Sequence, residues 1–185
     1  MKKVLGAFAL LVVLASCTTF HLVEPKRQQV GRSFSVEPQI QWSKYDAGWM
    51  EMWTVDGASL AAVRFYKGLK DGSPMFMANE GQTLPTFRSK MRAGEIREFV
   101  VDSLTQTGAN KVKAGRLSPA RFGGHRGFRF ELSFLTDDGL AMNGIATGTV
   151  IDGELQLIFY TGASVHYFGR YKAVVERMMT SVQTS

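Results

Sequence analysis

The sequence predicts an α+β fold, in which an antiparallel sheet of about six strands carries one internal helix and a C-terminal amphipathic helix. Three observations predict it: short runs of alternating apolar and polar residues, Asp-Gly pairs between those runs, and two segments with helical periodicity. The length of 185 residues favours a single domain. A composition of 45% hydrophobic, 11% aromatic and 21% charged residues is that of a folded chain and excludes a disordered one.

The strands are predicted from the runs that Asp-Gly pairs separate. Four such pairs occur, at 56–57, 71–72, 138–139 and 152–153. Asp-Gly suits the tight turn of an antiparallel hairpin. Strands are therefore expected at 49–55, 59–66, 126–135, 140–151 and 154–161, and the last three should form a meander. In 49–55, bulky apolar side chains occupy both faces, which predicts cover on both sides, by a helix and by either the loop 72–90 or a partner.

Two segments have apolar residues at helical spacing, and both helices should pack on the sheet. The first helix is expected at 94–107, where Ile96, Phe99 and Val100 begin an apolar stripe that ends before Gly108. The second is expected at 164–183, with Ser164 as its cap. Its stripe is formed by Tyr167, Phe168, Tyr171, Val174, Val175, Met178, Met179 and Val182. A stripe this wide should cover one face of the sheet.

The N-terminal residues 1–16 are predicted to be a signal peptide. Lys2 and Lys3 precede an uncharged run to Ala15, which is shorter than the roughly 20 residues of a membrane-spanning helix. The stretch Leu14-Ala15-Ser16-Cys17 resembles the lipobox of bacterial lipoproteins, whose cysteine is acylated after cleavage of the preceding bond. An ordinary signal peptide or an uncleaved anchor are the alternatives.

That resemblance implies a lipidated Cys17 that attaches the protein to a membrane. Residues 17–33 would then be the lipidated cysteine and a tether, part of which could dock as an edge strand, and 34–185 the globular domain. Thr18 follows the cysteine. In Gram-negative lipoproteins an aspartate there signals retention in the inner membrane, so its absence implies the periplasmic face of the outer membrane if the host is Gram-negative.

The order of elements over residues 33–183 is similar to the PsbP-like fold, an antiparallel sheet with helices on its faces. Trp42 after an early strand and the helix ending in MMTSV carry the resemblance, which contains no diagnostic motif. Small bacterial lipoproteins also have this fold. A generic α+β domain and a closed lipocalin-like barrel are the alternatives.

No catalytic, metal-binding or cofactor-binding motif occurs in the sequence. The three histidines, His21, His125 and His166, are far apart and lack zinc-site spacing. The only cysteine is assigned to lipid, so no disulfide is expected within the chain. Of the 22 basic side chains two lie in the signal peptide, which leaves 20 against 16 acidic ones, near +4. This weak and scattered charge argues against nucleic acid as a partner.

The candidate contacts for an anion or a partner are five basic residues, Arg88, Lys90, Arg92, Arg97 and Arg126. The first four surround the start of the first helix, where they could meet an anionic lipid, a glycan or an acidic envelope protein. Arg126 follows two glycines that could cradle an anion or could simply allow a sharp bend. A solvated loop and helix start is the alternative for the first four.

The expected function is that of a membrane-anchored cell-envelope lipoprotein that acts as a non-catalytic interaction or accessory module. The alternative is a carrier of a small apolar or lipid ligand, which requires a cavity between sheet and helix. An enzyme would require polar side chains that converge in a cleft.

Overall fold

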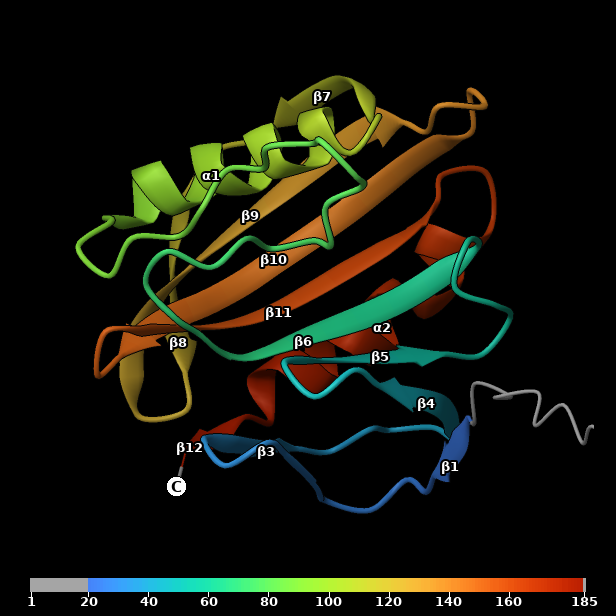
Figure 1. Ribbon diagram of the computed structural model, residues 1–185. Coiled ribbons are helices and arrows are strands. Elements are labelled where there is room, and N and C mark those ends of the chain that lie inside the picture. The colour runs from blue at the N-terminus through green and yellow to red at the C-terminus, as the bar shows by residue number, and fades with distance from the viewer. Residues whose placement is uncertain (1–19, 185) are drawn as a thin grey trace, which may run out of the picture.

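The computed structural model describes residues 20–184 and shows an α+β fold with two helices and a mostly antiparallel sheet (Figure 1). The strands are β1 (His21–Val23), β2 (Gln28–Val30), β3 (Phe34–Val36), β4 (Trp42–Asp46), β5 (Met50–Thr54), β6 (Ala61–Leu69), β7 (Asn110–Ala114), β8 (Ser118–Phe122), β9 (His125–Leu135), β10 (Ala141–Ile151), β11 (Glu154–Ala163) and β12 (Gln183–Thr184). The helices are α1 (Ala93–Gln106) and α2 (Tyr167–Thr180).

The main sheet has nine strands, so the predicted number of about six is wrong. Its order is β1-β4-β5-β6-β11-β10-β9-β7, and β8 pairs with β9. The additional strands are three to five residues long, too short for alternation to stand out from a loop. The two end strands β1 and β7 do not pair with each other, so the sheet is open and the barrel alternative is wrong.

The predicted meander is confirmed as β9, β10 and β11, three long antiparallel strands. Phe130 of β9 lies opposite Ala146 of β10, which in turn lies opposite Phe159 of β11. The Asp71-Gly72 pair does not join two strands, because the chain after β6 runs to α1. We call residues 70–92, which make this connection, the strap.

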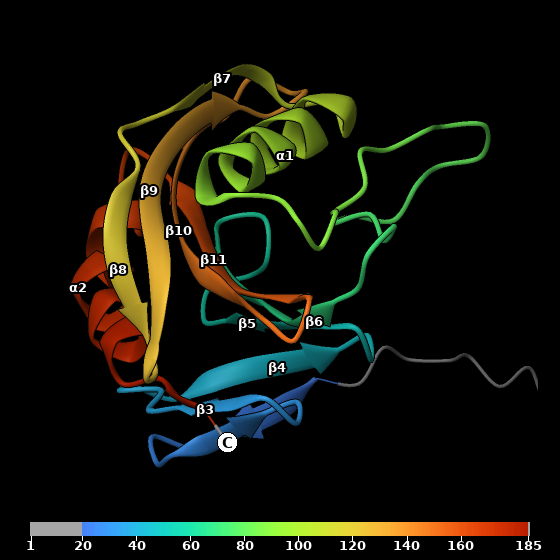
Figure 2. The same ribbon diagram turned by 90° about the vertical axis from the view of Figure 1, so that its left-hand side faces the viewer.

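The sheet curves around α1, and α2 lies on its opposite face (Figure 2). Each helix covers its own hydrophobic core. Val175 of α2 packs in one core with Trp53 and Phe65, and Phe99 of α1 packs in the other with Phe130. The C-terminal helix is shorter than the predicted 164–183, because Gln183 and Thr184 leave it to pair with β3. His166, not Ser164, precedes its first turn.

The segment expected to be a tether contributes two strands where it is described. β1 pairs with β4, and β2 belongs to a second sheet of order β12-β3-β2. Val23 and Val30 are buried, and this apolar burial fixes the segment to the domain. The folded domain therefore begins before the predicted boundary at Phe34.

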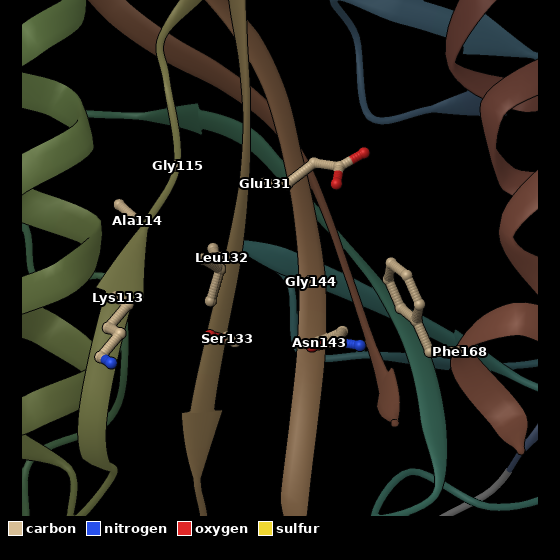
Figure 3. Close-up of a pocket in the computed structure, with 9 residues that line it drawn as sticks. All are labelled: Lys113, Ala114, Gly115, Glu131, Leu132, Ser133, Asn143, Gly144 and Phe168. Atoms are coloured by element: carbon tan, nitrogen blue, oxygen red, sulfur yellow. The ribbon is translucent and has the colours of Figure 1, made fainter. Parts of the chain in front are cut away.

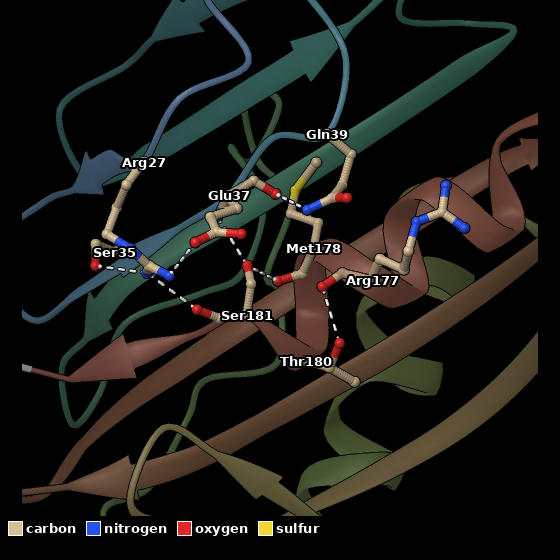
Figure 4. Close-up of polar contacts among 8 residues, drawn as sticks. All are labelled: Arg27, Ser35, Glu37, Gln39, Arg177, Met178, Thr180 and Ser181. Carbon is tan, nitrogen blue, oxygen red and sulfur yellow. Dashed lines mark hydrogen bonds and ion pairs between the residues drawn. The ribbon is translucent and has the colours of Figure 1, made fainter.

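A polar network fastens these N-terminal strands to the end of α2 (Figure 4). The Arg27 guanidinium donates hydrogen bonds to the Glu37 carboxylate at 2.7 Å, the Ser35 hydroxyl at 3.2 Å and the Ser181 carbonyl at 3.0 Å. The Ser181 hydroxyl accepts a hydrogen bond from the Glu37 N–H at 2.7 Å. The Arg27 side chain thus ties the N-terminal strands to Ser181, which lies 154 positions later in the chain.

A buried ion pair lies between β5 and β6, on the α2 side of the sheet. The side chains of Glu51 and Lys67 are 4% and 9% exposed, and Lys67 Nζ lies 3.2 Å from Glu51 Oε1 and 2.9 Å from Asp46 Oδ1. The Trp53 indole N–H donates to the second Glu51 oxygen at 3.2 Å. These bonds offset the cost of removing both charges from water.

The burial of Val175 makes the α2 core sensitive to a charge. Val175→Asp places an unpaired carboxylate in a fully buried site and should lower the free energy of unfolding by about 3 kcal/mol or more. Urea unfolding followed by circular dichroism measures the loss. Val165→Asp is the matched control, because Val165 is 94% exposed and its variant should unfold like the wild type. Equal stability of both variants would show that α2 is peripheral.

The ion pair predicts a rescue. Lys67→Met removes the closest cation of the buried Glu51 carboxylate, leaves Lys44 at 3.7 Å, and should cost up to about 3–5 kcal/mol. Adding Glu51→Leu removes the stranded charge and should restore most of that stability. Thermal unfolding of the two single variants and the double variant gives the coupling energy between Lys67 and Glu51. Losses of stability that simply add up in the double variant would contradict the predicted rescue.

Candidate functional site

Two of the four predicted basic residues before and in α1, Arg88 and Arg97, lie beside acidic side chains. The Arg88 guanidinium lies 3.6 Å from the Asp71 carboxylate, and Arg97 lies 2.8 Å from Glu98. The backbone N–H of Arg92, not its guanidinium, donates a hydrogen bond to the Glu95 carboxylate at 2.7 Å. This contact caps the first turn of α1. Such exposed pairs add little stability, but they offset the positive charge that an anion would meet.

Arg126 lies apart from these residues, in the β8–β9 hairpin. The glycines around it serve close packing. Gly123 has φ of 58°, and a Cβ there would lie 2.9 Å from the Thr184 nitrogen of β12. A Cβ on Gly127 would collide with the Gly148 carbonyl oxygen of β10. Steric room therefore accounts for these two glycines without an anion.

The histidines do not converge on a site. His125 is in the exposed β8–β9 hairpin, and the His166 ring packs edge-on against Tyr167 at 5.1 Å between centroids. Within residues 20–184, no group of three or more His, Cys, Asp or Glu side chains is placed to hold a metal ion. Over the same residues, no helix is both long and apolar enough to cross a membrane. Cys17 lies outside the described residues.

One hollow of about 340 Å³ lies on the sheet face between β7 and the start of α2 (Figure 3). Lys113 and Phe168 lie at its two sides, with Glu131 and Asn143 between them. Glu131 already accepts hydrogen bonds from Lys172 at 3.0 Å and from Arg129 at 3.4 Å. The Lys172 bond is the main cause that lowers the pKa of Glu131, and its charge is offset within the protein.

The strap covers the concave face of the sheet on the α1 side. Met75 and Phe87 are fully buried, and Met50 of β5 packs in the same core. The loop 72–90 is thus the second cover that the apolar faces of β5 predicted. At its base, the Phe87 carbonyl accepts the Gly72 N–H at 2.8 Å.

Two further hollows adjoin the strap, and Phe76 lines both. The larger, which we call the apolar groove, has a volume of about 500 Å³ and is lined by Trp49, Gly68, Leu69, Lys70, Ser73, Pro74, Phe76, Met77 and Ala78. Trp49 and Met77 are 37% and 80% exposed at its surface. These two side chains give the groove an exposed apolar rim.

The smaller hollow, which we call the Arg64 cavity, has a volume of about 180 Å³. It is lined by Ala58, Ser59, Arg64, Phe76, Leu104, Thr107, Phe134, Thr136, Met142, Phe159 and Thr161. The Arg64 guanidinium donates to the Thr161 hydroxyl at 3.0 Å. Arg64 is partly exposed, and its partial burial lowers the pKa of the guanidinium.

Sequence reasoning missed Arg64. Its only signal was a cation inside the apolar run Ala61–Tyr66, and a strand exposed on one face gives the same pattern. The curvature of the sheet and the covering strap place this partly exposed residue in the wall of a cavity, and neither is visible in a local pattern.

No family model matches the sequence, and no curated protein sequence matches it. In three dimensions the chain is similar to cyanobacterial PsbP (CyanoP) from Synechocystis sp. PCC 6803, with a TM-score of 0.56 and 9% identity over 98% of this chain and 99% of that one. It also matches LpqN, involved in cell envelope biogenesis of Mycobacterium tuberculosis, with a TM-score of 0.41 and 10% identity over 93% of this chain and 87% of that one. The first likeness spans nearly all of both chains, and the protein therefore has a PsbP-like fold.

Proposed function

We propose that the protein is a lipid-anchored component of the bacterial cell envelope whose domain acts as a non-catalytic interaction module. The observation that carries this proposal is the stretch Leu14-Ala15-Ser16-Cys17 at the end of an uncharged run. In this proposal the signal peptide 1–16 is removed and Cys17 is acylated. Thr18 after the cysteine favours the periplasmic face of the outer membrane in a Gram-negative host.

The start of the domain supports close contact with the membrane surface. β1 begins at His21, four residues after Cys17, and four residues span at most about 14 Å. Phe20 and Leu22, which flank this start, are 48% and 65% exposed. They are apolar side chains placed to meet lipid headgroups or a partner in the envelope.

Anionic lipid, glycan or an acidic protein is the proposed chemistry of the partner. Among the five predicted basic residues, Lys90, Arg92 and Arg126 have no ion pair within residues 20–184. These three retain the charge that such a contact needs, whereas Arg88 and Arg97 share theirs with Asp71 and Glu98.

A carrier of a small apolar or lipid ligand is the second candidate function. The apolar groove favours it, because its volume of about 500 Å³ and its lining by Trp49, Phe76 and Met77 suit an apolar ligand. Methionine is flexible and is common at surfaces that adapt to their ligands.

Lipidation predicts a clear loss of labelling. Cys17→Ala removes the thiol that would be acylated, so metabolic labelling with palmitate should fall to background and the protein should leave the membrane fraction. Ser16→Ala is the matched control, because a small residue remains before the cysteine, and it should label like the wild type. Undiminished labelling of Cys17→Ala would refute the anchor.

A further inference from the structure

Arg64 is a cation without a counter-ion. Among residues 20–184 no carboxylate lies within 4 Å of its guanidinium, and the neutral Thr161 hydroxyl is the one hydrogen-bond acceptor that it contacts. A guanidinium has five N–H donors, so most of them have no partner within residues 20–184. Arg64 is partly exposed, so water reaches these donors, and a ligand carboxylate that displaces this water gains charged hydrogen bonds.

The charge and the apolar lining of the Arg64 cavity indicate which class of anion would fit it. Arg64 is the only charged residue that lines it, so the site balances one negative charge and not the two of a phosphate monoester. The planar guanidinium matches a carboxylate through two parallel hydrogen bonds. Phe134, Met142 and Phe159 form the apolar part of the wall, which suits a carboxylate attached to a hydrocarbon.

The apolar groove supplies room for that hydrocarbon. The cavity alone has the volume of about six water molecules. Phe76 of the strap is common to the cavity and the groove, so a chain that passes this ring would run from one to the other. The groove contains Lys70 as its one charged residue, and Trp49, Leu69 and Pro74 make it otherwise mainly apolar.

The strap can admit such a chain with few broken contacts. From Phe76 to Gln82, a single hydrogen bond, from the Gln82 amide to the Gln106 carbonyl of α1, ties the strap to the rest of residues 20–184. The base of the strap is held separately, by the paired backbone of Gly72, Ser73 and Phe87. The part that carries Phe76 and Met77 is therefore held by one hydrogen bond to α1 and by the packing of Phe76 against the core.

We propose that the concave face binds an amphipathic monocarboxylate of the fatty-acid class, with its carboxylate on Arg64 and its alkyl chain in the apolar groove beyond Phe76. This inference rests on the second candidate function, that of a carrier, and names the ligand. It assigns Arg64 as the residue that recognises the head group, and Trp49 and Met77 as contacts of the chain.

Decanoate binding to the full chain tests the proposal. All variants carry Cys17→Ala, so that no acyl group of the protein itself competes for the groove. Calorimetry should show decanoate binding to the parent, and Arg64→Met should weaken it about tenfold or more through loss of the charged hydrogen bonds. Decan-1-ol, which has the same chain without the charge, should bind both proteins equally. Arg116→Met, which removes an exposed cation of the segment between β7 and β8, should bind decanoate like the parent.

The stability of the Arg64 variants shows whether Arg64 recognises the carboxylate or only supports the fold. Arg64→Met removes an unpaired charge and fills the same space, so its melting temperature should equal or exceed that of the parent. Arg64→Lys keeps the charge but loses the planar fork, and it should fold normally and bind decanoate several-fold more weakly.

Two results would overturn the inference in different ways. Equal affinity of the parent and Arg64→Met for decanoate, with decan-1-ol also bound, would leave a carrier without carboxylate recognition. Binding of neither decanoate nor decan-1-ol to the parent would overturn both the inference and the carrier function.

Discussion

The need to cover both faces of the central strands shapes the rest of this fold. In β11 every residue after Glu154 is buried, and its side chains point alternately into the two cores. Apolar strands of this kind cannot leave either face in water. The α2 helix and the N-terminal strands cover one face, and α1 with the strap covers the other (Figure 2). The strap is long because one helix is too narrow to cover a curved sheet.

The parts of the fold that were predictable are those with a long local pattern. The strands β9, β10 and β11 have ten or eleven residues each, and α1 and α2 have fourteen, enough for a period to appear. β1, β2 and β3 have three residues each, and β1 and β3 pair with segments farther along the chain, β4 and β12. Their pairing depends on tertiary contacts such as the one between Arg27 and Ser181, which no local pattern contains.

In the candidate site, too, some residues were predictable from the sequence and others depend on tertiary contacts. The basic residues near α1 stand out in the sequence, yet the Asp71 carboxylate that faces Arg88 also accepts the Ser89 N–H, and this pairing requires the folded strap. Conversely, Arg64 and Lys67 lie three positions apart in one strand and point to opposite faces of the sheet. Lys67 finds Glu51 there, whereas Arg64 finds only Thr161. Whether a charge on this strand is neutralised depends on the neighbouring strand, and this difference separates a structural ion pair from a candidate binding group.

The pairing of β3 with both β2 and β12 also has a consequence for the order of folding. β3 lies near the start of the chain, and its second neighbour is formed by Gln183 and Thr184. Contacts of such long sequence separation form late, since the loop between them must close first. The second sheet therefore remains incomplete until Gln183 and Thr184 have been synthesised. A chain cut short before Gln183 would leave β3 paired with β2 alone and would expose its other edge.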